Sequence, residues 1–323
     1  MPPPPDDTTM AERRLILLAA LSLGLAALYL GWGLRQPLGY ILGLRTGRLA
    51  QLVLVGASIG AATVMFQTLA GNRLLTPGII GFDALFVALQ TFLVLILGGG
   101  GYAALSVLPK FLIETASLTA AGLLLFGLML RKGASDLLRL ILTGVILGVL
   151  LRGLASFAQR LLDPSEFAVV QQASFASFGP SPLPLLVIAA FALALALAAA
   201  LRLSALLDVA TLGRDAARTL GVDHDRLVLA SLAVIALMVA VSTALVGPVT
   251  FLGLLAASLA HSAVPGHRHR HLIPAAALIG AAILIAGQFT FERLLGLQSS
   301  LAVIVEFLGG LLFLALILRR HPA

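Results

Sequence analysis

The sequence has no cysteine and few charged residues, which make up 11% of its 323 positions. The lack of cysteine excludes disulfides and cysteine-ligated metal sites. Soluble domains average about 25% charged and about 45–50% apolar residues, whereas 60% of this chain is hydrophobic. A water-soluble fold could not cover so much apolar surface. The composition therefore excludes a soluble protein and indicates one that spans a membrane.

Lysine is also scarce, and neither Lys110 nor Lys132 belongs to a GxxxxGK[ST] loop. The chain is therefore not itself a P-loop ATPase, and any ATP-driven step needs another chain. The apolar segments carry few His, Asp or Glu residues, so we predict no catalytic residue, no metal ligand and no enzyme activity. The net charge of +7 comes from arginines scattered between apolar segments. This scatter argues against nucleic-acid binding and for contact with membrane lipid.

Long apolar segments without polar alternation predict membrane-spanning helices rather than barrel strands. About 20 apolar residues cross a bilayer as a helix. We predict an all-α polytopic membrane protein, with a disordered cytoplasmic leader at 1–14 and one transmembrane domain at 15–323. Its ten predicted spans are 15–33, 49–70, 80–98, 107–130, 137–158, 183–201, 227–246, 251–264, 273–291 and 300–318. The span at 251–264 is short, so it is either a half-span or a helix extended by its flanks.

Basic residues are distributed unevenly among the loops. Of the 21 lysines and arginines, fourteen fall in the loops that share a side with both termini and seven in the others. The positive-inside tendency then places both termini in the cytoplasm. The inner connection 202–226 and the outer connection 159–182 are too long for simple turns. Each is predicted to contain a short helix, the inner one at 215–220 between Gly213 and Gly221.

Three blocks of the sequence form one ordered pattern. The first, at 45–84, reads RTGRLAQLVLVGASIGAATVMFQTLAGNRLLTPGIIGFDA. The second, at 212–222, reads LGRDAARTLGV, and the third, at 247–261, reads GPVTFLGLLAASLAH. Together they resemble the iron-chelate and vitamin B12 class (FecCD type) of ABC importer permeases, and the resemblance extends over nearly the whole chain.

The resemblance implies roles for individual residues. It implies coupling to an ATPase through Leu212, Gly213, Ala217, Leu220 and Gly221. It implies structural motif positions at Gln67, Asn72, Pro77, Gly81, Gly247, Pro248 and Gly253. It implies docking of a binding protein on the outer arginines Arg45, Arg48 and Arg293. For these arginines the alternative is contact with lipid phosphates or with Glu292 and Glu306.

The resemblance also implies a type II ABC importer fold in the bacterial inner (plasma) membrane. The function implied is that of a permease subunit through which an ATP-driven importer moves ferric siderophore into the cytoplasm. The partners implied are an ABC ATPase dimer that binds ATP and Mg²⁺, a periplasmic or lipid-anchored siderophore-binding protein, and a second permease. No cofactor is expected in this chain. A secondary transporter, or a permease for another metal chelate or cobalamin, remains an alternative.

Two departures from the family pattern concern the second permease. The sequence reads ASLAH at 257–261 and GGLLF at 309–313, where homodimeric members carry P-H-x-x-R and G-x-P-x-F. Its last third instead resembles the second permease of paired catecholate-siderophore systems. We therefore expect a heterodimer of two permeases, with a homodimer as the alternative.

Two groups of ionisable residues have both a structural and a functional interpretation. The HRHRH segment at 267–271 suggests either a metal site or a solvated basic turn near lipid headgroups, and we prefer the turn. Glu114, Glu292 and Glu306 fall near the outer ends of predicted spans. Pairing or snorkelling explains them at least as well as transport chemistry.

Overall fold

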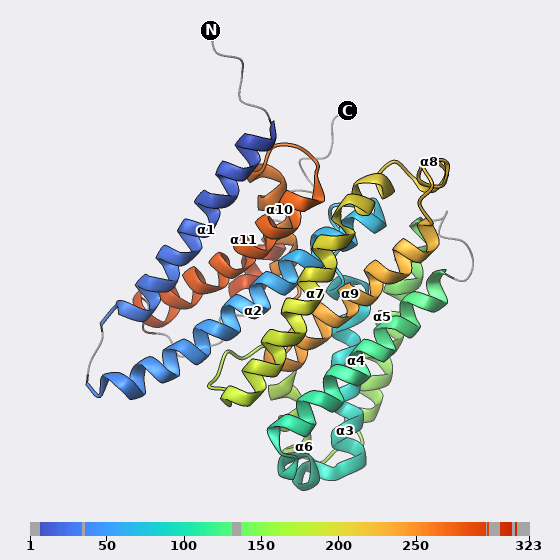
Figure 1. Cartoon of the computed structure of the whole chain (residues 1–323). Helices are drawn as coiled ribbons and strands as arrows, with labels where there is room; N and C mark the ends of the chain where they lie inside the picture. The colour runs from blue at the N-terminus through green and yellow to red at the C-terminus, as the bar shows by residue number, and fades with distance from the viewer. Residues whose placement is uncertain are drawn as a thin grey trace.

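The computed structural model of the chain describes residues 7–33, 36–130, 137–294, 296, 304–311 and 314. Over these residues every regular element is a helix (Figure 1), which confirms the predicted all-α class. The longer helices are α1 (Asp7–Gly31), α2 (Leu38–Ala70), α3 (Asp83–Ala104), α4 (Val107–Leu130), α5 (Leu137–Gln159), α7 (Leu183–Ala210), α9 (His224–Val246) and α11 (His269–Phe289). The shorter ones are η1 (Gly78–Phe82), α6 (Pro164–Ala173), α8 (Arg214–Thr219), α10 (Leu252–Ala263) and η2 (Thr290–Leu294).

Nine of the ten predicted spans correspond, in order, to helices of the structure. In the part of the chain that the structure describes, 8 helical segments are long and apolar enough to cross a membrane. Helix α10 has 12 residues, as the short apolar run predicted. The last predicted span, 300–318, lies largely outside the described residues, of which 304–311 are helical.

Three boundaries differ from the prediction. Helix α1 begins at Asp7, so residues 7–14 are its first two turns rather than part of a disordered leader. Helix α2 begins at Leu38, well before the apolar core of that span. Helix α7 continues to Ala210, so the inner connection is shorter than 202–226. The exposed Arg202 does not end α7, because its long side chain can reach water while Leu207 continues the buried stripe.

Helix α2 forms the centre of the bundle and packs against α7, α9, α10 and α11. Its closest neighbour is α11, where glycines remove the side chains that would keep two backbones apart. A Cβ atom added at Gly56 would lie 2.5 Å from backbone atoms of Gly280 and Ala281. Close approach through small residues is the usual way that helices associate in a membrane. The α2–α11 pair is therefore a tightly packed core around which the other helices are arranged.

Two short helices mark the opposite ends of the bundle, which we call the α6 end and the α8 end (Figure 1). The start of α1 lies at the α8 end. Helix α6 begins at Pro164, and its Glu166 carboxylate accepts a hydrogen bond of 2.8 Å from the backbone N–H of Gly99. This bond attaches α6 to α3. Both short helices were predicted, α6 in the outer connection and α8 in the inner one.

Candidate functional site

Helix α8 lies between two glycines, Gly213 and Gly221, at positions where the backbone has a positive φ angle. Gly213 has a φ of 93° and Gly221 a φ of 83°, a region that is unfavourable for residues with a Cβ atom. Ala217 is buried on the inner face of α8, and its carbonyl accepts a hydrogen bond of 2.9 Å from the N–H of Val222. The short helix predicted between Gly213 and Gly221 is present, and Gly221 follows it with a left-handed backbone. The two glycines set the direction in which the helix enters and leaves the turn.

The outer face of α8 combines a fixed position with exposed apolar side chains. Arg214 and Arg218 each donate a hydrogen bond of 2.8 Å to Asp225 at the start of α9, which fastens α8 to the bundle. Leu212 and Leu220 flank the helix, and each is 62% exposed. Exposed leucines on a fixed short helix at the end of a membrane bundle are suited to contact with another protein.

A buried histidine joins three long helices at the same end. The ring Nδ1 and the backbone N–H of His269 lie 2.6 and 2.8 Å from the Asp208 Oδ1 atom of α7. The ring Nε2 lies 2.6 Å from the hydroxyl of Thr68 in α2. His269 is 2% exposed. We call Asp208, His269 and Thr68 the α7–α11 clasp.

The clasp corrects the interpretation of the HRHRH segment as a solvated turn. His269 and His271 are both buried, at 2% and 5% exposed, in the first turn of helix α11. Within the described residues, no group of three His, Cys, Asp or Glu side chains is arranged to hold a metal ion. Sequence reasoning missed Asp208 and Thr68, which lie far from the histidine in the chain. The unusual density of histidine was the only signal.

Arg45 has an internal role at the α6 end of the bundle. Its guanidinium donates hydrogen bonds of 2.8 Å to the carbonyls of Leu30 and Trp32 and one of 3.3 Å to Gly33. Leu30 lies in the last turn of α1, where a helix lacks partners for its last C=O groups, and Trp32 and Gly33 directly follow the helix. Arg45 is 6% exposed. Arg45 is therefore buried rather than presented on the outer surface, because its guanidinium caps the end of α1, and its docking role stays a prediction.

Arg48 and Arg293 converge on one carboxylate. The Glu292 side chain lies 3.0 Å from Arg48 and 3.4 Å from Arg293. It also accepts a hydrogen bond of 3.2 Å from Gln288. Both arginines remain partly exposed and line a cavity of 230 Å³ with Tyr29. The two arginines thus form the ion pairs with Glu292 that were the alternative to docking, and docking by these two arginines stays a prediction.

The first-block motif residues form the connection between α2 and α3. Gln67 is buried and donates a hydrogen bond of 2.6 Å to the carbonyl of Arg73, while its own backbone carbonyl accepts the N–H of Asn72. The Asn72 side chain accepts a bond of 2.9 Å from the N–H of Leu74, which closes a tight turn. Pro77 then precedes η1.

The remaining motif residues allow close approach between segments. Gly81 has a φ of 123°, and a Cβ atom there would lie 3.2 Å from the backbone of Gly148 in α5. Gly247, with a φ of 96°, follows α9 and would bring a Cβ atom to 3.0 Å from Ala176. Pro248 is buried beside it. A side chain at Gly253 would collide with Thr63 of α2. These residues shape the backbone and present no reactive group.

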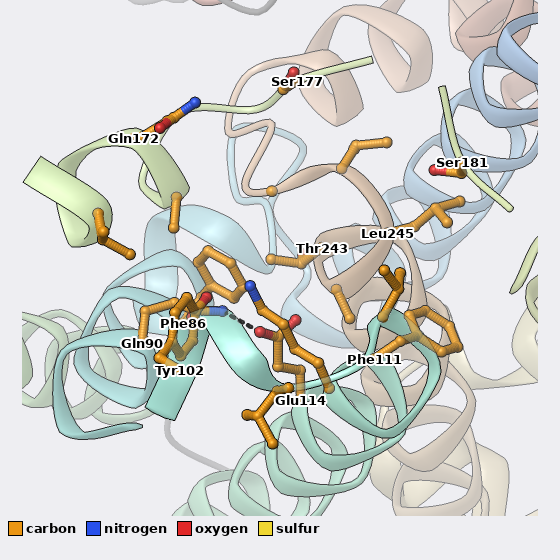
Figure 2. Close-up of a pocket in the computed structure, with 18 of the residues that line it drawn as sticks. Phe86, Gln90, Tyr102, Phe111, Glu114, Gln172, Ser177, Ser181, Thr243 and Leu245 are labelled. Atoms are coloured by element: carbon orange, nitrogen blue, oxygen red, sulfur yellow. Dashed lines mark hydrogen bonds between the residues drawn. The ribbon is translucent and has the colours of Figure 1, made fainter. Parts of the chain in front are cut away.

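A cavity of 520 Å³ opens near the α6 end, between α3, α4, α6 and the end of α9 (Figure 2). Glu114 of α4 faces this cavity and is 3% exposed. It accepts a hydrogen bond of 2.7 Å from Gln90 of α3, and Gln90 accepts one of 2.6 Å from the Tyr102 hydroxyl. Sequence reasoning selected Glu114 but missed Gln90 and Tyr102, because their contact depends on how α3 packs against α4.

Comparison with known proteins assigns nearly the whole chain to one family. It matches the FecCD transport family over residues 15–319. The petrobactin import system permease protein YclO of Bacillus subtilis (strain 168) is 37% identical over 307 residues, which cover 94% of this chain and 98% of that protein. The ferric enterobactin transport system permease protein FepD of Escherichia coli (strain K12) is 28% identical, over 87% of this chain and 82% of its own length.

A solved structure supports the fold. It is described as an inward-facing conformation of a metal-chelate type ABC transporter, and it matches with a TM-score of 0.79 and 24% identity. The match covers 95% of this chain and 99% of that one. With a family match from residue 15 to residue 319 and a relative that is similar over nearly its full length, this chain belongs to the FecCD transport family.

Proposed function

We propose that this chain is the membrane-spanning permease subunit of an ATP-driven importer that carries ferric siderophores into the cytoplasm. The observation that carries the proposal is helix α8, a short helix fixed between two left-handed glycines and flanked by two exposed leucines. A loop that merely joins two spans needs no such structure. Membership of the FecCD transport family supports the same function.

Helix α8 is the part that receives force from the ATPase. Leu212 and Leu220 enter a groove of the ATPase, and Gly213 and Gly221 keep the helix in the orientation that fits it. ATP and Mg²⁺ bind in the ATPase dimer, so this chain makes and breaks no covalent bond. The α8 end, with the start of α1, then faces the cytoplasm, and the protein lies in the bacterial inner membrane.

The α6 end receives the loaded binding protein. Arg48 and Arg293 are the docking residues, because both are partly exposed and already lie beside a cavity. The guanidinium group binds a carboxylate through two hydrogen bonds, which suits it to acidic side chains on a partner. Arg45 supports this surface indirectly by holding the end of α1.

The substrate class follows from the relatives. Two of them are permeases of petrobactin import systems, at 37% and 30% identity, and another is named for ferric enterobactin. The ASLAH and GGLLF departures favour a second, different permease in the complex. Petrobactin is therefore the first chelate to test, in a complex with the second permease.

Reconstitution of the complete importer tests the proposal. This chain would be co-expressed with its ATPase, binding protein and second permease, and uptake of radiolabelled iron into proteoliposomes would be measured for ferric petrobactin, ferric enterobactin and a ferric hydroxamate. Vitamin B12, labelled separately, would complete the panel. ATP-dependent uptake of at least one ferric siderophore is expected. Uptake that continues without ATP but requires a proton gradient would instead identify a secondary transporter.

A further inference from the structure

The 520 Å³ cavity near the α6 end has no part in coupling or docking as described above. Its volume lies within the range of about 300–1,000 Å³ that small-molecule pockets occupy. Four structural units enclose it: the α3–α4 pair, α6, the segment at 173–181, and the end of α9. The cavity is therefore lined by several elements of the fold and is more than a gap between two neighbouring helices.

Two charged side chains face the cavity from one helix. Lys110 and Glu114 are four residues apart on α4, which places them on the same helical face. Among the described residues that line the cavity, they are the only charged ones. The Lys110 ammonium lies 3.9 Å from the centre of the Tyr102 ring, a cation–π arrangement. One wall thus presents both a cation and a carboxyl group.

A chain of hydrogen bonds fixes the carboxyl group in place. The Tyr102 hydroxyl donates to Gln90, and the Gln90 amide donates to the Oε1 atom of Glu114. A network that served only to join α3 to α4 would need neither the adjacent lysine nor an open cavity in front of it. This arrangement resembles a preorganised binding wall.

The opposite side of the cavity supplies hydroxyl groups. Thr243 of α9 and the serines Ser177 and Ser181 lie across the opening from Glu114 (Figure 2). Ser177 is exposed at the rim. The backbone N–H of Ser177 donates a hydrogen bond of 2.7 Å to the carbonyl of Val246, so the segment that carries the serines is anchored to α9.

We propose that this cavity is a substrate subsite that receives one polar arm of the ferric chelate, an inference that rests on the proposed function. The arm carries an amine or amide N–H, which Glu114 accepts, beside an anionic or carbonyl oxygen, which Lys110 binds. The Tyr102 ring and the neighbouring phenylalanines contact its apolar part. The chelate reaches this subsite after the binding protein releases it at the α6 end.

Transport kinetics give the first test. Glu114→Gln and Lys110→Met are each expected to raise the KM for ferric petrobactin about tenfold, the size of losing one hydrogen bond to a charged group. Vmax is expected to change less than KM. The control is Glu12→Gln, an exposed carboxylate at the other end of the molecule, which should retain the KM of the wild type. An unchanged KM in both cavity variants contradicts the proposal.

Cysteine protection gives a second test that does not depend on transport. Because the chain has no cysteine, Ser177→Cys creates a single thiol at the cavity rim, and Ser165→Cys creates one on the exposed face of α6, outside the cavity lining. A membrane-impermeant maleimide would label each variant in the complete complex, with the binding protein either empty or loaded with ferric petrobactin.

The two labelling rates separate occupancy of the cavity from docking. Loaded binding protein is expected to slow labelling of Ser177→Cys about fivefold or more relative to empty binding protein, and to leave Ser165→Cys unchanged. Adding Glu114→Gln should remove the protection. Equal rates with loaded and empty binding protein overturn the subsite even where uptake is normal. Protection without ATP-dependent uptake supports the subsite and refutes the proposed function instead.

Discussion

Replacing Asp208 by alanine removes the centre of the α7–α11 clasp. The Asp208 carboxylate receives both the backbone N–H and the ring N–H of His269 on a single oxygen. The variant therefore leaves two donors at the start of α11 without their acceptor. Because α7 leads directly into α8, the same change loosens the link between α8 and the α2–α11 core.

The magnitude follows from the contacts. Hydrogen bonds to a charged group contribute about 1.5–3 kcal/mol each, and a buried donor without a partner costs about 1–3 kcal/mol. The His269 ring is almost fully buried, but the Asp208 side chain is partly exposed, so water can replace some of what is lost. We expect Asp208→Ala to destabilise the folded protein by about 2–4 kcal/mol. Asp208→Asn retains an acceptor oxygen and should cost about half as much.

A double-mutant cycle with His269→Ala measures the pair directly. Unfolding of the detergent-solubilised protein would be followed for both single variants and the double variant, with Asp215→Ala on the exposed face of α8 as the control. The expected interaction energy is about 1.5–3 kcal/mol. In the reconstituted importer, the ratio of ATP hydrolysed to chelate transported should rise for Asp208→Ala and stay at the wild-type value for Glu12→Gln, an exposed residue outside α8.

The result that refutes this reasoning is additivity. If the double variant loses the sum of the two single losses to within about 0.5 kcal/mol, Asp208 and His269 do not act as a unit. A normal ratio of ATP hydrolysis to transport in Asp208→Ala, together with the expected loss of stability, would limit the clasp to a structural role.

Three further predictions concern the other sites. Gly221→Val, which strains the backbone by about 1–3 kcal/mol, and Ala217→Glu, which places a charge beneath α8, should leave the protein inserted but weaken ATPase co-purification; normal co-purification and uptake in both would remove the coupling role. The double change Arg48→Glu with Arg293→Glu should slow association of the binding protein about tenfold at low salt and less at high salt. If the double variant associates as fast as the wild type at both salt concentrations, the two arginines serve only to pair with Glu292. Gly280→Val should lower stability by about 3 kcal/mol or more, measured by unfolding in detergent, and a wild-type value would mean that α2 and α11 separate easily.

Sequence reasoning predicted the helices well because hydrocarbon imposes one rule on every span. The backbone N–H and C=O groups of an apolar segment in hydrocarbon must form hydrogen bonds within the segment, as in a helix. The apolar segments themselves therefore locate α2, α7 and α9. The ends were harder to predict. Helix α7 runs past Arg202 because a long charged side chain does not force a helix to stop. The glycines that flank α8 were recognisable because glycine is the residue that most readily adopts the left-handed backbone at a helix boundary.

The side chains whose surroundings differed from the prediction were those with partners far away in the sequence. Arg45 looked like an exposed cation because its acceptors are backbone carbonyls of α1, which no residue type reveals. His269 looked solvated because Asp208 lies 61 residues before it. In both cases the local pattern showed a polar group near a membrane surface, and only the packing of helices determined whether water or protein satisfied it.

The glycine contact between α2 and α11 also has a mechanical consequence. Where backbone meets backbone, no side chain can change rotamer to let one helix slide past the other, so the pair moves as a single stiff strut. Any change that opens first one end of the permease and then the other must therefore be carried by helices that pivot about this strut. Helix α7, which packs on both members of the pair and ends beside α8, is placed to act as the lever.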